Sequence, residues 1–273
     1  MQQSLPKLVT FDGEARSGKG TVVGMVKDYL RDECDRKVML IDAGQVFRVL
    51  AVGMVHAGVD INYPPAIDAY LQNESNITSG VRLVKNVYHM PKPKRDALLY
   101  TSGVGVNSAK IAARPLSQVF KDSLLRKWLK DARTEGYDTA LLDGRALEEV
   151  GGMLATEGLC DYVLGLFFVC DPVVSAQRTL GYMPRPYSEL PDDLKAKVDE
   201  LVEQIHARNK ADRERAVQPI VEPKNAPRYK ITQVPVQLPA RTPRPMAIID
   251  RSIEVPMDAM VLPIARLVAR YIS

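Results

Sequence analysis

Short runs of apolar residues recur along the chain, and each is long enough for one buried strand. They cover residues 8–11, 37–42, 139–142, 162–170 and 246–250. Between them, apolar residues recur at helical spacing in residues 22–30, 45–57, 116–133, 194–205 and 258–272. Because strands alternate with helices, we predict an α/β fold with a doubly wound, five-stranded parallel sheet. In such a sheet the ligand lies beyond the carboxyl ends of the strands, and three of the runs end in aspartate: Asp42, Asp143 and Asp250.

Three stretches interrupt this alternation. Residues 60–107 carry only one short helical pattern, near Ala66–Leu71, so we predict a small mobile insert on the sheet. Residues 172–191 hold four prolines and no clear period, which leaves open a solvated loop or a lid. Residues 219–245 hold seven prolines in 27 residues, which predicts an extended surface excursion rather than a second domain. The whole chain, residues 1–273, is expected to be a single domain.

The strongest chemical signal is a glycine-rich turn between the first strand and the first helix. It reads Gly13-Glu14-Ala15-Arg16-Ser17-Gly18-Lys19-Gly20-Thr21. Its backbone N–H groups and the helix N-terminus can surround one anion, to which Lys19 adds a full positive charge. We therefore predict a phosphate-binding loop (P-loop) for a nucleotide; the simpler alternative is a glycine-rich turn with an accidental lysine. Gly20 stands where such loops usually carry Ser or Thr, so Mg²⁺ would be held through waters or other groups.

Charged residues on otherwise apolar stripes give a second signal. Arg48 is the only formal charge in the apolar segment 45–57, and it must either reach the surface or bind an anion. Further along, the stripe of Val198, Leu201 and Ile205 continues at helical spacing onto three charged residues: Arg208, Asp212 and Arg215. These charges either point into a polar cleft or belong to an exposed helix end with weak ion pairs. We favour the cleft.

Composition narrows the class of protein. The 273 residues are 46% hydrophobic and 26% charged, with a net charge of +4, which is typical of a globular protein and too weak to argue for nucleic acid. The longest apolar run, residues 162–170, is too short to span a membrane, and residues 1–7 show no signal peptide. Three widely spaced cysteines and three scattered histidines favour reduced thiols and no metal site in the protein. We therefore expect a cytoplasmic monomer that acts on small molecules, without nucleic acid or membrane partners.

Four patches of the chain, in this order, form one pattern. The first is the glycine-rich loop, including Gly20; the others are Ile41–Arg48, Leu142–Arg145 and Arg208–Pro219. The last three patches are similar, in the same order, to the motifs D-[TS]-G-x-x-[YF]-R, D-G-R-D and R-D-x-x-D-x-x-R-x-x-x-P. Ala112–Pro115 fits a fifth, weaker motif. In these features the chain resembles the cytidylate (CMP) kinases, a family of P-loop nucleoside monophosphate kinases whose loop also has Gly in place of Ser or Thr.

The resemblance implies an ATP-dependent kinase that uses Mg²⁺ and converts CMP or dCMP to CDP or dCDP. The loop residues Gly13 to Thr21 would hold ATP, and three residues would be catalytic: Lys19, Arg145 and Arg215. The acceptor phosphate would be clamped by Arg48, Arg145 and Arg215, and its sugar contacted by Arg208 and Asp212. The insert would then lie on the acceptor side of the site.

The lid candidate, residues 172–191, would bring an arginine over the transferring phosphoryl group. Arg178 and Arg185 are the two arginines in it.

The chain departs from the family at positions that read the base. A Ser or Thr of the second motif is Ala43 here, the Asp that closes D-G-R-D is Ala146, and an expected Arg is Gln118. A family Ser near the sugar falls on Ala109, with Ser108 one place earlier. Loss of polar groups that pair with a substrate relaxes or redirects the choice of substrate. Because the phosphate-binding residues are kept and most base-reading residues are not, we expect phosphoryl transfer but leave open whether the base is cytosine.

Two alternatives follow from these departures. One is a P-loop kinase for a different small-molecule acceptor. The other is a nucleotide-binding protein without catalysis, which the five converging charges of the acceptor side argue against.

Overall fold

The computed structural model describes residues 4–241 and 243–273. The described residues form two compact units. The first contains the residues before Asp42 together with Leu129–Arg213 and Ile220–Ser273, and the second contains Asp42–Trp128 and Glu214–Pro219. The glycine-rich loop therefore belongs to the first unit and the predicted insert to the second.

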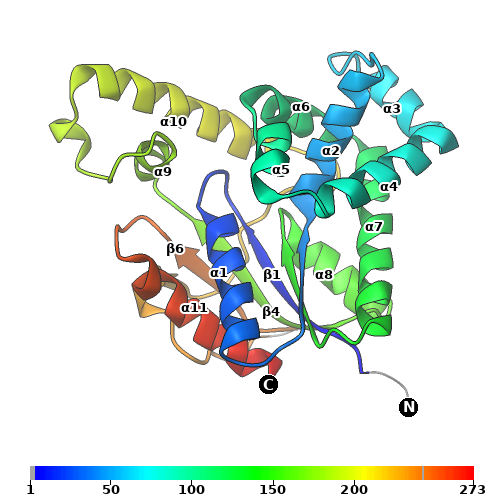
Figure 1. Ribbon diagram of the computed structural model, residues 1–273. Coiled ribbons are helices and arrows are strands. Elements are labelled where there is room, and N and C mark those ends of the chain that lie inside the picture. The colour runs from blue at the N-terminus through cyan, green and yellow to red at the C-terminus, as the bar shows by residue number, and fades with distance from the viewer. Residues whose placement is uncertain (1–3, 242) are drawn as a thin grey trace. The chain divides into compact units, whose positions relative to one another are not determined.

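One parallel sheet of six strands supports the first unit, in the order β2-β3-β1-β4-β6-β5 (Figure 1). The pairs β1/β3, β1/β4, β4/β6 and β5/β6 all run parallel. The strands are β1 (Lys7–Gly13), β2 (Val38–Asp42), β3 (Thr139–Asp143), β4 (Asp161–Val169), β5 (Arg228–Lys230) and β6 (Met246–Asp250). The five predicted strands are confirmed, and β5 is a sixth at the edge.

Helices cover both faces of this sheet, which confirms the doubly wound arrangement. In Figure 1, α1 (Lys19–Asp32) and α11 (Met257–Ile272) lie in front of the strands and α8 (Leu147–Thr156) lies behind them. Further along the chain come α9 (Pro172–Thr179), α10 (Asp192–Arg213) and two short 3₁₀ helices, η1 (Tyr187–Glu189) and η2 (Ile231–Gln233). Since both faces are covered, strand residues are buried on both sides, which explains their continuous apolar runs.

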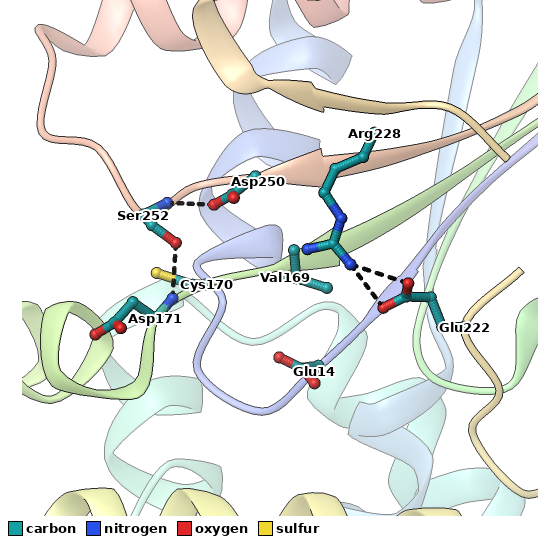
Figure 2. A pocket seen from close by; sticks show the side chains of 8 residues that line it. All are labelled: Glu14, Val169, Cys170, Asp171, Glu222, Arg228, Asp250 and Ser252. Carbon is teal, nitrogen blue, oxygen red and sulfur yellow. Dashed lines mark hydrogen bonds and ion pairs between the residues drawn. The ribbon is translucent and has the colours of Figure 1, made fainter.

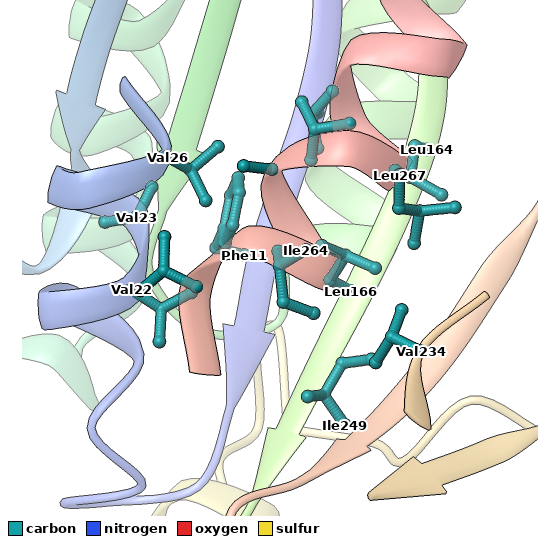
Figure 3. Packing of buried hydrophobic residues seen from close by; sticks show 14 of the residues in the cluster. Phe11, Val22, Val23, Val26, Leu164, Leu166, Val234, Ile249, Ile264 and Leu267 are labelled. Carbon is teal, nitrogen blue, oxygen red and sulfur yellow. The ribbon is translucent and has the colours of Figure 1, made fainter. Parts of the chain in front are cut away.

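The core between the sheet and helices α1 and α11 fixes the start of the glycine-rich loop. Phe11 of β1 packs with Val22 of α1, Ile264 of α11 and Leu166 of β4 (Figure 3). Burial of each such side chain contributes about 1.5–3 kcal/mol. The strand before the loop and the helix after it are therefore held against one another.

The proline-rich excursion, residues 219–245, is anchored to the core at a few widely spaced apolar residues. Ile231, Val234 and Leu238 are all buried in the core beside α11, and β5 pairs with β6. The segment predicted as an extended surface excursion is therefore anchored in the core at these three residues, while others, such as Val221 and Val236, are more than half exposed.

The second unit is helical throughout its longer segment. Its helices are α2 (Ala43–His56), α3 (Pro64–Gln72), α4 (Glu74–Tyr88), α5 (Lys92–Leu99), α6 (Ser102–Ala112) and the part of α7 (Pro115–Thr134) up to Trp128. They share a core of their own, which includes Met54, Ile67, Leu99 and Ile111. The weak pattern of residues 60–107 therefore conceals four helices, where the sequence predicts only the first.

Two smaller expectations also need correction. In the helix predicted over residues 116–133, helical spacing puts Val119 near the same face as Leu125 and Leu129, but Val119 is 63% exposed, whereas the other two are buried. Residues 172–191, expected to lack a helical period, begin with helix α9, which the Asp171 carboxylate caps. None of the helices in the described part of the chain has both the length and the apolar character that a membrane span requires.

Candidate active site

The first half of the glycine-rich loop is fixed beside strand β4 and the start of helix α8. Gly13 has φ +137°, and a Cβ there would lie 2.2 Å from the backbone oxygen of Phe168. The buried carboxylate of Asp12 accepts from the backbone N–H groups of Gly13 at 2.6 Å and Leu147 at 2.6 Å. Burial raises the pKa of Asp12, and these N–H donors oppose that shift. The loop therefore leaves the sheet in one fixed direction.

Two further N–H groups of the loop also have protein acceptors. Glu14 N–H donates to the Phe168 carbonyl at 2.9 Å, and Ala15 N–H donates to the Asn209 side chain of α10 at 2.8 Å. Glu14 also forms an ion pair with Arg213 of the same helix. The end of α10 is thus tied to the loop at two points, and β4 holds the loop at a third.

The second half of the loop is held by a buried arginine. Gly18 adopts a left-handed conformation at the start of α1 (φ +76°), and its carbonyl accepts from Arg251 Nη1 at 2.7 Å. Arg251 is 4% exposed, and burial, aided by the nearby Arg178 charge, lowers its pKa to about 10. Arg178 in turn donates to the carbonyls of Arg251 and Ile253, each at 2.7 Å. The lid candidate Arg178 therefore holds the segment after β6 in this structure, and its proposed closure stays a prediction.

Lys19 lies at the first position of α1, where it forms an ion pair with Asp143 at the end of β3. Both side chains are mostly buried, with 13% and 11% exposure. A Cβ at Gly20 would lie 3.6 Å from Asp143 Oδ2. The carboxylate thus occupies space close to where a Ser or Thr side chain would begin.

A cavity of about 870 Å³ opens beside the loop. Its charged lining consists of Arg16, Arg178 and Arg251 together with Glu254, which pairs with Arg178. Apolar side chains line it as well, namely Met183, Val255, Met257 and Met260. Its size is within the range of small-molecule sites, and this combination of cationic and apolar walls suits a phosphorylated ligand with an apolar ring.

A smaller cavity of about 260 Å³ lies at the ends of β4 and β6 (Figure 2). Its lining contains four carboxylates, from Glu14, Asp171, Glu222 and Asp250, and one arginine, Arg228. Arg228 is paired with Glu222, with Nη2 at 2.9 Å from one carboxylate oxygen. Because the remaining lining charge is negative, this cavity would repel a phosphate.

The end of α10 brings three of the predicted residues together. Asp212 is 3% exposed, and its carboxylate pairs with Arg208 Nε at 3.0 Å and with Arg145. Arg145 follows Asp143 at the end of β3. Asp212 therefore points inward, whereas Arg215 lies beyond the last residue of the helix, Arg213. The polar cleft itself stays a prediction.

Arg48 and Arg215, the remaining predicted residues, belong to the second unit. Arg48 on α2 donates to the Leu99 carbonyl at 2.9 Å, and its guanidinium lies 4.6 Å from the centre of the Tyr100 ring. Tyr100 OH is 3.3 Å from Asp42 Oδ2. Burial, followed by the Asp42 charge, raises the pKa of Tyr100. Arg48 is therefore partnered inside its own unit rather than extended into solvent.

The positions that depart from the family pattern face the protein itself. Gln118 is 2% exposed, and its side-chain amide donates to the Ala112 carbonyl. Ser108 donates to the Gly105 carbonyl of its own helix at 2.8 Å. Ala146 adopts a left-handed conformation (φ 57°) and its N–H donates to Asp12.

Several residues of this site escaped the sequence analysis. Asn209 and Arg251 bind the loop from 194 and 233 positions away, so no local pattern marks them. Asp143 was noted only as the end of a strand, although its place at the carboxyl edge was the available signal.

A lysine-bearing glycine loop between β1 and α1, at the carboxyl edge of a parallel sheet, defines a P-loop nucleotide-binding protein. Comparison with known proteins gives the family: a family model described as cytidylate kinase matches residues 9–236. The chain belongs to the cytidylate kinase family, and it is a nucleoside monophosphate kinase, a phosphotransferase.

Individual relatives agree with this assignment. A cytidylate kinase of Aliivibrio salmonicida is 26% identical over 214 residues, which cover 78% of this chain and 84% of that protein. One of Shewanella piezotolerans is 25% identical, covering 84% and 90% of the two chains. One of Pseudomonas aeruginosa is 27% identical, covering 81% and 85%.

Proposed function

We propose that the protein transfers the γ-phosphoryl group of ATP to the phosphate of CMP or dCMP, which gives CDP or dCDP and ADP. One observation carries this proposal. The glycine loop with Lys19 and the Arg145–Asp212–Arg208 group lie in one unit, so donor- and acceptor-directed charges share the carboxyl edge of a single sheet.

In this proposal the loop holds the donor. The N–H groups of Gly13, Glu14 and Ala15 have protein acceptors, and we expect those of the second half of the loop, from Ser17 to Thr21, to bind the ATP phosphates. Lys19 would leave Asp143 and span the β- and γ-phosphates. The cavity beside Arg251 would take the rest of the nucleotide.

Mg²⁺ would be held chiefly by the ATP phosphates, with Asp143 as the nearest protein group. No group of three or more His, Cys, Asp or Glu side chains suited to a metal occurs in the described residues. In most P-loops a Ser or Thr hydroxyl at the position of Gly20 binds the ion. The Asp143 carboxylate can take this role, since its Oδ2 lies beside Gly20. When bound, the ion would neutralise charge on the donor phosphates.

The acceptor phosphate would be clamped by Arg48, Arg145 and Arg215, and its sugar contacted by Arg208 and Asp212. An acceptor phosphate oxygen forms the new bond to the γ-phosphorus, while the bond from that phosphorus to the bridging oxygen of ADP breaks. The nucleophile is already an anion, so the protein needs to position it and balance charge rather than remove a proton. Asp212 would orient both of its arginines toward the acceptor.

A second candidate is a kinase of the same class that prefers another acceptor. The observation that favours it is that the side chains of Gln118 and Ser108 donate to backbone carbonyls of nearby residues. Such groups offer little to a cytosine ring.

Residues 172–191 are the proposed lid, and the segment contains Met183, which is 76% exposed. The single-domain organisation, the monomeric state and the cytoplasmic location expected from the sequence stay predictions.

The test is a panel of acceptors with Mg·ATP: CMP, dCMP, UMP, AMP and a shikimate-like hydroxy acid. Production of CDP or dCDP far faster than the other products supports the proposal, with Lys19→Met as the inactive control. Faster phosphorylation of another acceptor would assign the second candidate, and ATP binding without any product would refute both.

A further inference from the structure

The second unit contains a buried charged cluster that none of the proposed roles uses. Lys121 and Asp122 are consecutive residues of α7, and Gln218 lies in the segment Glu214–Pro219. They are 2%, 8% and 8% exposed. Lys121 Nζ lies 2.5 Å from Gln218 Oε1 and 2.8 Å from Asp122 Oδ1, and Gln218 Nε2 donates to Asp122 Oδ2 at 2.9 Å.

These contacts fix the orientation of the Gln218 amide. Its oxygen faces the ammonium group and its NH₂ faces the carboxylate, so each end of the amide meets a group of complementary polarity. Burying a lysine and an aspartate is costly unless they are paired and hydrogen-bonded. Apolar residues of similar size would fill the same space at lower cost, which suggests that the cluster specifies one arrangement of the chain.

The backbone at Gln218 supports this reading. Gln218 has φ +50°, a left-handed conformation that is uncommon for a residue other than Gly, Asn or Asp. Such strain persists only where the surroundings hold it, and it concentrates at functional positions. Here the surroundings that hold it are the buried side chains of Lys121 and Asp122.

The segment that Gln218 fastens also carries Arg215, three residues earlier. Residues on both sides of Glu214–Pro219 belong to the first unit, whereas this segment belongs to the second. We propose that Lys121, Asp122 and Gln218 are positioning residues that hold Arg215 in the second unit. This inference rests on the proposed role of Arg215 as a ligand of the acceptor phosphate.

The first test is Gln218→Glu. A carboxylate at this position would still accept from Lys121, but it would face the Asp122 carboxylate with a like charge. We expect the KM for the best acceptor to rise about tenfold or more, while the KM for ATP stays within about twofold. Amide hydrogen exchange in residues 214–219 should become faster.

The second test exchanges the two groups. In the double variant Gln218→Glu, Asp122→Asn, the amide and the carboxylate change places, the cluster keeps its net charge and each hydrogen bond has a donor and an acceptor. We expect the acceptor KM and the exchange rates to return to within about threefold of the original protein. Gln72→Glu, an exposed position of the same unit, is the control for charge and should change neither quantity.

An unchanged acceptor KM in Gln218→Glu, or a double variant as impaired as the single one, would overturn the proposal. If Gln218→Glu does not fold, Gln218→Met removes the same hydrogen bonds without adding charge and should show the same shift in acceptor KM. If the original protein phosphorylates no acceptor, the proposed function fails, and hydrogen exchange in residues 214–219 alone then decides whether the cluster anchors the segment.

Discussion

Gly18→Ala tests how the glycine loop is held. Gly18 has φ +76° and ψ 12°, and a Cβ there would lie 1.8 Å from Arg251 Nη1 and 2.8 Å from its Cζ. A methyl group would therefore displace the guanidinium that donates to the Gly18 carbonyl at 2.7 Å. The perturbation acts on the backbone and on one buried charge together.

Two effects set the magnitude. A left-handed conformation costs an alanine about 1–2 kcal/mol, and loss of a hydrogen bond from a charged group costs about 1.5–3 kcal/mol. We expect the free energy of unfolding to fall by about 3–5 kcal/mol, a large part of the stability of an ordinary domain. Urea denaturation followed by circular dichroism measures it, and the KM for ATP should rise because the loop carbonyls lose their donor.

A double-mutant cycle with Arg251→Ala separates the two effects. Once the guanidinium is absent, Gly18→Ala should cost only its backbone term, about 1–2 kcal/mol. Gly13→Ala is the contrasting case, since its Cβ would meet the Phe168 backbone at 2.2–2.8 Å, which no rotation of a side chain relieves. Full additivity of Gly18→Ala with Arg251→Ala, or a loss below about 1 kcal/mol for Gly18→Ala alone, would refute the reasoning.

Lys19→Met is expected to lower kcat by about 10²–10³-fold with the circular dichroism spectrum retained; full turnover would exclude its role. Asp212→Asn removes the charge that two arginines share and should lower the free energy of unfolding by about 2 kcal/mol in urea, and no loss would contradict the pairing. Burial raises the pKa of the Cys160 thiol to about 12, so only about 10⁻⁴ of it is thiolate at pH 8. A thiol reagent should therefore modify Cys34 first, with Cys160 gaining about tenfold per unit of rising pH, and equal rates at pH 8 would count against this. Ala146→Asp restores the aspartate of the D-G-R-D motif, so the ratio of the phosphorylation rates of CMP and UMP should rise. Because aspartate tolerates the φ of 57° at this position, the thermal stability should not fall.

The sequence predicts five of the six strands and most of the helices that flank the sheet, because burial on defined faces leaves a strong hydrophobic period. Strand β5 has no hydrophobic period, because only three residues at the sheet edge form it and their side chains are partly or fully exposed. Helix α4 is not predicted because its first residues are polar and leave a weak hydrophobic period, although Asn73 caps it by accepting from the N–H groups of Ser75 and Asn76. The capping residue marks the start of this helix in the sequence, whereas the hydrophobic period alone does not.

For the site, residues on a motif or an apolar stripe could be predicted, and residues defined by distant partners could not. Lys19 and Asp212 carry their own local signals. The roles of Arg251 and Gln218 depend on distant partners. Arg251 binds the Gly18 carbonyl, 233 positions away, and Gln218 binds Lys121, 97 positions away. A single sequence contains no pattern that joins such pairs.

The same distinction explains why the reaction class is firmer than the acceptor base. A phosphate monoester carries the same charge whatever base is attached, so arginines that clamp it act on every nucleoside monophosphate alike. Base discrimination instead needs polar groups that would be left unpaired by the wrong ring, and these can give 10⁴–10⁵-fold selectivity, whereas shape alone gives about 10–200-fold. At Ala43 and Ala146 no such side chain exists, and the Gln118 amide is already bound to the Ala112 carbonyl. If these positions alone set the preference, the selectivity for CMP over UMP should lie in the lower range, and a value near 10⁴ would require polar readers from elsewhere in the second unit.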